Sequence, residues 1–142
     1  MDEYKVDFHV HTSYSDGRAK PMDILKRAKE LEYDMISITD HDGIDGIKEA
    51  LIAGEALEIK VIPGVELATV TEEGVELHIL GYYFDPDHPR LNEVLEDLKA
   101  KRNDRNERLV AVLNEMGYDL NMDDLRKVQP NNYIGKPVIA ER

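Results

Sequence analysis

The sequence predicts an α/β domain in which parallel strands alternate with helices. Three apolar runs, at residues 5–10, 35–39 and 59–67, have the length and composition of strands. The segments between them, 21–32 and 44–57, carry apolar residues at helical spacing. This alternating order favours a parallel sheet with right-handed crossovers, and a length of 142 residues suits one domain.

The first strand places two histidines side by side. Apolar residues alternate with polar ones from Val6 to Val10, so His9 and His11 point to the same face. Neutral imidazole is a common metal ligand, and the carboxylate of Asp16 would help to neutralise a bound cation. The alternative is a pair of exposed histidines on an edge strand.

The rest of the chain predicts a hairpin followed by helices. A fourth strand over residues 75–84 is expected to pair with the third strand across a turn at 71–74. The later elements are a long helix over 89–116 that Gly117 closes, a short helix over 121–128 capped by Asn121, a loop over 129–132, and the first turns of a helix over 137–142.

Composition limits the possible functions. With 34% charged residues and no apolar window of membrane-spanning length, the chain is expected to be well solvated, free of membranes and cytoplasmic. Residues 1–5 are acidic and lead into a strand, unlike a signal peptide. Since there is no cysteine, nitrogen and oxygen ligands must hold any metal.

The formal net charge of −12 argues against non-specific binding of duplex DNA. An acidic surface repels the nucleic-acid backbone unless basic residues cluster locally or bound metals add positive charge. A small phosphorylated substrate that bound cations attract remains compatible with this charge.

Six side chains are expected to converge on one face of the sheet, because they fall at or just beyond the ends of four successive predicted strands. An open cluster of imidazoles and carboxylates suits a catalytic divalent-metal site, in which one shared carboxylate bridges two cations. The alternative is ordinary core or surface residues. The six are His9, His11, Asp16, His41, Glu66 and His78.

The motifs that carry these residues resemble the PHP (polymerase and histidinol phosphatase) family. They read HVHTSYSDG at residues 9–17, TDHD at 39–42, PGVE at 63–66 and HILGY at 78–82. The resemblance implies a distorted (β/α)7 barrel and a metal-dependent phosphoesterase, most like the stand-alone members that act on nucleotides and short RNA. Residues 1–142 would then form one PHP domain, incomplete at its C-terminus and supplying roughly the N-terminal half of the barrel.

The resemblance also implies how two or three divalent ions, manganese, iron, zinc or magnesium, would be held. A hydroxide between the metals would attack the phosphorus of a small phosphorylated substrate or short oligonucleotide. The implied ligands are His9, His11 and Glu66 for one ion, Glu66 and His78 for a second, and Asp16 and His41 for a third.

Two departures from the family pattern alter these expectations. Residues 135–140 read GKPVIA where the family usually has Gly-Arg-Pro-His-x-Ala, so Val138 replaces a ligand histidine and the second cation would bind weakly or not at all. A later Asp-x-His ligand pair is missing, which is typical of a fragment. A fragment would expose sheet edges and apolar faces and favour self-association.

Further polar residues have two interpretations each. Asp40 and Asp42 would orient His41, or simply cap the following helix. Tyr14 is a candidate phosphate contact, and Lys136 takes the place of the family's arginine as a point charge. Arg102, Arg105 and Arg108 are also candidate phosphate contacts, although their spacing favours a solvated helix face shared with Asp104 and Glu107.

The main hypothesis is therefore a metal-dependent phosphoesterase that hydrolyses a nucleotide-like phosphate ester, as a phosphatase or exonuclease. A second hypothesis is a non-catalytic PHP module that binds metal but is inactive in isolation, which Val138 favours. A third is a metal-dependent amidohydrolase, which would usually need a ligating lysine at a later strand end.

Overall fold

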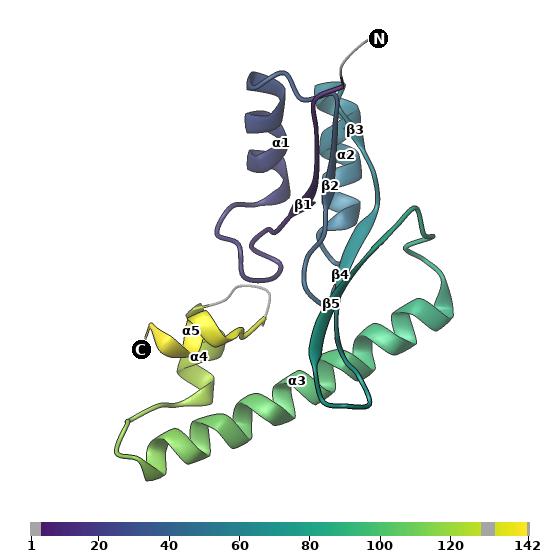
Figure 1. The fold of residues 1–142 in the computed structure, drawn as a ribbon. Helices are drawn as coiled ribbons and strands as arrows, with labels where there is room; N and C mark the ends of the chain where they lie inside the picture. The colour runs from purple at the N-terminus through teal and green to yellow at the C-terminus, as the bar shows by residue number, and fades with distance from the viewer. Residues whose placement is uncertain (1–3, 129–132, 142) are drawn as a thin grey trace.

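A three-stranded parallel sheet with two flanking helices forms the N-terminal half. The computed structural model describes residues 4–128 and 133–141. The elements run β1 (Val6–Val10), α1 (Pro21–Glu30), β2 (Met35–Ile38), α2 (Ile47–Leu57) and β3 (Lys60–Val61). The strands pair in parallel in the order β1-β2-β3, which confirms the predicted parallel sheet (Figure 1).

The core of this half lies between the helices and the sheet. Buried residues of α1, β2 and α2 form one apolar cluster, as their spacing in the sequence predicts. Burying this face ties both helices to the sheet and holds the carboxyl ends of β1 and β2 in a fixed relation. The cluster consists of Leu25, Ala28, Ile36, Ile38, Ala50, Ala53 and Ile59.

The prediction of one continuous third strand over residues 59–67 is wrong. The segment divides at Pro63 into β3 and β4 (Gly64–Val70), because proline has no N–H to donate to a continuing ladder. β3 pairs with β2, whereas β4 pairs antiparallel with β5 (Glu76–Tyr82). The predicted hairpin is thus confirmed, but its first strand begins anew after the proline.

α2 begins at Ile47, three residues later than predicted. The Ile47 N–H donates to the Ile44 carbonyl at 3.0 Å, so the segment before the helix forms a turn. Asp42, which opens this segment, has a positive φ of 48° that an α-helix cannot contain.

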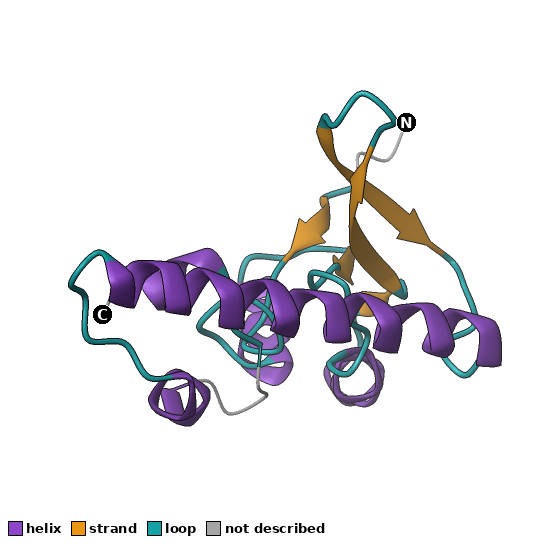
Figure 2. Cartoon of the chain, turned by 90° about the horizontal axis from the view of Figure 1, so that it is seen from below, coloured by secondary structure: helices purple, strands orange, loops and turns teal. Residues whose placement is uncertain are grey.

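Three helices follow the hairpin. They are α3 (Pro89–Glu115), α4 (Met122–Val128) and α5 (Lys136–Ala140), and α3 extends across most of the molecule in Figure 2. The side chain of Asn121 accepts from the Asp123 N–H at 2.8 Å, which confirms the predicted cap. The predicted loop over 129–132 lies outside the described residues. A second apolar cluster joins α3, α4 and α5 through Val110, Leu125, Ile134, Val138 and Ile139.

The described strands confirm an α/β fold that is only part of a barrel. They form one parallel sheet of three strands and one antiparallel pair, so the seven-stranded closure stays a prediction. Among the described helices, none has the length and apolar content needed to cross a bilayer.

Candidate metal centre

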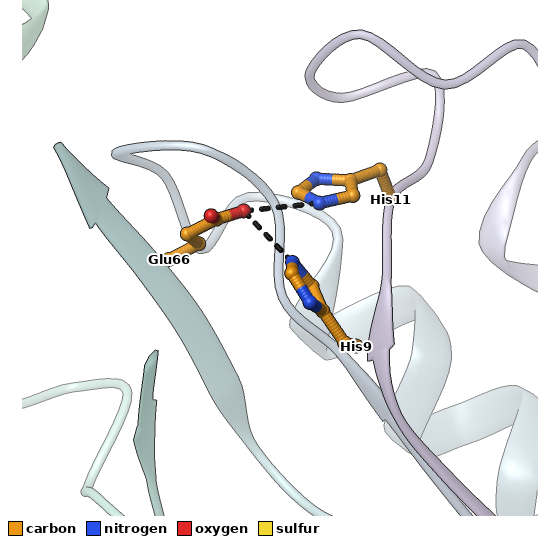
Figure 3. A group of neighbouring side chains, drawn as sticks. All are labelled: His9, His11 and Glu66. Carbon is orange, nitrogen blue, oxygen red and sulfur yellow. Dashed lines mark hydrogen bonds and ion pairs between the residues drawn. The ribbon is translucent and has the colours of Figure 1, made fainter. Parts of the chain in front are cut away.

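Glu66 lies at the centre of a cluster of four imidazoles. Its Oε2 atom is 3.0 Å from Nε2 of His9 and 3.0 Å from Nε2 of His11 (Figure 3). The same oxygen is 3.4 Å from Nδ1 of His41, and Oε1 is 2.8 Å from Nδ1 of His78. The Glu66 side chain is only 5% exposed, so one buried carboxylate contacts all four rings.

The strands and the segments that follow them bring these residues together from both sheets. The alternation of β1 places His9 and His11 on one face, with ring centroids 5.1 Å apart. His41 follows β2 and forms an isolated parallel bridge with Glu66. Glu66 therefore sits near the start of β4, not near the end of the third strand as predicted. His78 reaches the cluster from β5, where it is paired with Ala68.

Asp16 joins the cluster from the loop after β1. Its two oxygens are 3.6 Å from Nδ1 of His11 and 3.5 Å from Nε2 of His41. Asp40 holds this loop, since it accepts from the Thr12 N–H and hydroxyl, both at 2.7 Å, and from the Ser15 hydroxyl. In the described structure Asp40 makes no hydrogen bond to His41, so its contacts support the loop rather than that ring.

The six side chains form three overlapping groups in which every donor atom lies within 4.8 Å of the others. Mixed imidazole and carboxylate donors at this spacing suit divalent transition metals or magnesium. The groups are His9 with His11 and Glu66, His11 with Asp16 and His41, and His41 with Glu66 and His78. All six residues that the sequence singles out are therefore brought together.

The electrostatics favour the protonation states that metal binding requires. Burial acts to raise the pKa of Glu66, but its hydrogen bonds with His9 and His78 and the nearby His41 and His11 outweigh this and lower it. Burial lowers the pKa of His41, against the opposing effect of Glu66 and Asp16. At neutral pH the carboxylate is therefore charged and the His41 imidazole neutral, which are their ligating forms.

A cleft of about 380 Å³ opens beside the cluster. Asp16, His41 and His78 line one part of it, and Arg105 and Lys136 line another. The predicted phosphate contact Tyr14 is not among the lining residues, because its hydroxyl donates to Glu49 at 3.3 Å. The cleft is thus lined both by cationic side chains and by candidate metal ligands.

The prediction that the arginines of α3 lie on a solvated face is wrong for Arg102 and confirmed for Arg108. Arg102 is only 9% exposed, and its NH1 atom donates to Asp42 at 3.0 Å. Arg108 is exposed and pairs with Asp104 at 2.7 Å. Like Asp40, Asp42 makes no hydrogen bond to His41 within the described part of the chain.

Tyr133 is a cleft residue that the sequence pattern did not single out. Its ring stacks on His41 at a centroid distance of 6.3 Å, and the guanidinium of Arg102 lies 4.3 Å from its centroid. Burial raises the pKa of Tyr133 to about 12, so its hydroxyl stays a hydrogen-bond donor at neutral pH. One aromatic residue just before the GKP segment is too weak a signal to identify this role.

Comparison with known proteins identifies the family. The family model described as "PHP domain" matches residues 7–137. The chain belongs to the PHP family. A 5'-3' exoribonuclease from Haemophilus influenzae is 38% identical over 138 residues, which cover 96% of this PHP chain and 46% of the relative. A 3',5'-nucleoside bisphosphate phosphatase from Chromobacterium violaceum is 31% identical over 112 residues, covering 79% and 39% of the two chains.

Solved PHP-like structures share the fold. A candidate metal-dependent phosphoesterase from Bifidobacterium adolescentis matches with a TM-score of 0.87 and 28% identity, covering 99% of this PHP chain and 49% of that one. An amidohydrolase from Chromobacterium violaceum, solved with bound sulfate and without metal, also gives 0.87 at 28% identity, covering 96% and 48%. The chain spans about half the length of the relatives it matches.

Proposed function

We propose that this PHP chain is a metal-dependent phosphoesterase that acts on a nucleotide-like phosphate ester. The observation that carries the proposal is the contact of one buried carboxylate, Glu66, with four imidazoles beside a cleft whose lining includes basic side chains. The functions of two relatives, an exoribonuclease and a nucleoside bisphosphate phosphatase, support this substrate class.

The three donor groups support an assignment of the metal ligands. His9, His11 and Glu66 would hold one divalent ion, Asp16 and His41 another, and His78 would share Glu66 with a third. Bound divalent metals polarise a phosphoryl oxygen and lower the pKa of water to near neutrality.

The chain's own residues would orient the ester. Arg105 and Lys136 line the same cleft as the candidate ligands Asp16, His41 and His78, and their positive charges suit phosphate oxygens. The hydroxyl of Tyr133 adds a neutral donor in the same cleft. The Tyr133 ring stacks on His41 and packs against the guanidinium of Arg102, and these contacts hold its hydroxyl in place.

A second candidate function, a non-catalytic metal-binding module, is favoured by Val138. This side chain is buried among Leu125, Ile134 and Ile139 and offers no ligand atom. The cation that Glu66 and His78 share would then depend on these two residues and His41. A site short of one ligand would bind its ion more weakly and reduce turnover.

Hydrolysis assays separate the two functions. We expect Mn²⁺-dependent phosphate release from a nucleoside 3',5'-bisphosphate or a short 5'-phosphorylated RNA. His9→Ala should reduce the rate by at least about tenfold, since even groups that merely support ligands have effects of that size. His88→Ala, which changes an exposed histidine at the start of α3, should leave it unchanged. Metal binding without hydrolysis of either ester would instead support the non-catalytic module.

A further inference from the structure

Arg102 and Asp42 form a buried ion pair in the lining of the cleft that His41 and His78 also line. The NH1 atom of Arg102 donates to Oδ2 of Asp42 at 3.0 Å, and both side chains are 9% exposed. The pair joins the middle of α3 to the segment after β2, sixty residues away in the sequence. Such a pair gives little net stability, because removing two charges from water offsets their attraction.

Asp42 contacts β4 at Glu66 and again two residues further along the strand. Its N–H donates to the Glu66 carbonyl at 2.8 Å, and its Oδ1 accepts from the Ala68 N–H at 2.9 Å. The first of these bonds and the donation of the Glu66 N–H to the Asp40 carbonyl at 3.2 Å make up the His41–Glu66 bridge. The side-chain bond to Ala68 adds a further hold on the backbone from which the Glu66 carboxylate projects. The φ of 48° at Asp42 allows its backbone and its side chain to reach the same strand.

Arg102 holds Asp42 in this position. A buried carboxylate without a cation would be drawn toward water, and its bond to Ala68 would be lost. The Tyr133 ring packs on the guanidinium at 4.3 Å and fixes its orientation. Within the described structure the Nε atom of Arg102 has no hydrogen-bond partner, so stability alone is a poor explanation for the placement of this arginine.

We propose that Arg102 is a positioning residue that acts through Asp42 to hold Glu66 in place for metal binding. The inference rests on the proposed metal centre and goes beyond it by separating Arg102 from the other cations of the cleft. Arg105 is exposed, and its NH2 atom donates to the side-chain oxygen of the neighbouring Asn106 at 3.2 Å. Arg105 therefore faces the cleft freely, whereas Arg102 is committed to the support of the ligand.

Manganese affinity tests the inference, with Arg105→Met as the matched control. Arg102→Met should weaken Mn²⁺ binding by about 10-fold to 100-fold, the range for residues that orient metal ligands. Arg105→Met should stay within about twofold of the wild type, as expected of an independent site. Equilibrium dialysis with Mn²⁺ alone measures both values, and circular dichroism shows that the variants are folded.

A second substitution separates positioning from direct contact. In Asp42→Asn/Arg102→Met the buried charge is gone, while the amide oxygen can still accept from Ala68 and asparagine tolerates the positive φ. We expect this double variant to recover Mn²⁺ affinity to within about twofold of the wild type. If Arg102 acts on the metal site directly and not through Asp42, the double variant will bind Mn²⁺ as weakly as Arg102→Met does. That result would overturn the inference.

Neutral variants keep the test decisive if Arg102→Met does not fold. Asp42→Gly/Arg102→Met lacks the acceptor for Ala68 but has no strain at the positive φ. It should bind Mn²⁺ at least about tenfold more weakly than Asp42→Asn/Arg102→Met. Equal affinities would show that the Asp42 contact does not position the site.

Histidine ring resonances provide a readout without metal. In chelator-treated protein, loss of the Asp42 contact should shift the ring signals of His9 and His78, which bond to Glu66, and leave His88 unchanged. Unshifted rings in folded Arg102→Met would refute the positioning role. A wild type that binds no Mn²⁺ would refute the proposed metal centre instead, and the two failures are thereby distinguished.

Discussion

At the scale of single residues, the cluster depends on one carboxylate that contacts four imidazoles. The alternation of β1 was enough to predict that His9 and His11 share a face, because side-chain direction in a strand has a period of two. The contact of Arg102 with Asp42 could not be predicted in this way. It joins residues sixty positions apart, and the helical spacing of the arginines indicated a solvated face instead.

The lowered pKa of His41 predicts how metal-free protein responds to acid. The folded state keeps His41 neutral below its ordinary pKa of 6.5, whereas the unfolded chain takes up a proton there. Stability is therefore lost as the pH falls from about 6.5 toward the folded pKa. In the presence of chelator, the thermal unfolding midpoint of His41→Asn should fall less between pH 7 and pH 5 than the midpoint of the wild type. An unchanged slope would contradict the burial of this ring, and His88→Asn serves as the control.

At the scale of elements, most of the secondary structure followed from apolar periodicity and turn residues. The βαβαβ order, the hairpin and the cap at Asn121 are confirmed. The division of the third strand does not follow from periodicity, because the apolar run over residues 59–67 indicates one continuous strand. Pro63 is the residue in that run that indicates a break. This division lets β4 leave the parallel sheet and carry Glu66 to the edge of β2.

The close approach of β4 to β2 makes Gly64 sensitive to substitution. A Cβ atom there would lie 2.2 Å from the Ser37 hydroxyl oxygen and 3.0 Å from the Ile38 carbonyl oxygen. Gly64→Ala should therefore lower the free energy of unfolding by about 1–3 kcal/mol, as overpacking does. Gly43→Ala, whose added Cβ would have its nearest neighbour at 3.6 Å, should change it by less than about 0.5 kcal/mol. Equal urea midpoints for the two variants would disprove the close contact.

At the scale of the whole molecule, two apolar clusters are joined across the cleft by polar contacts. Asn106 donates to the Ile134 carbonyl at 2.7 Å, and Arg102 reaches Asp42, so α3 connects the C-terminal helices to the β2 end of the sheet. Sequence patterns predicted the helices but not this arrangement, because polar residues in α3 are equally compatible with solvent. The β4–β5 hairpin exposes four apolar side chains, Val70, Val75, Leu77 and Ile79. Self-association through exposed apolar surface stays a prediction, which sedimentation equilibrium can test.

The proposed function requires the six side chains to form a divalent metal centre around Glu66. The most direct test is the metal content of the purified chain after loading with Mn²⁺ and removal of free ions, compared with Glu66→Gln. We predict two or more equivalents in the wild type and a loss of most of them in Glu66→Gln, because that carboxylate belongs to two of the three ligand groups. A wild type without bound metal, or a Glu66→Gln variant with the full content, would contradict the account.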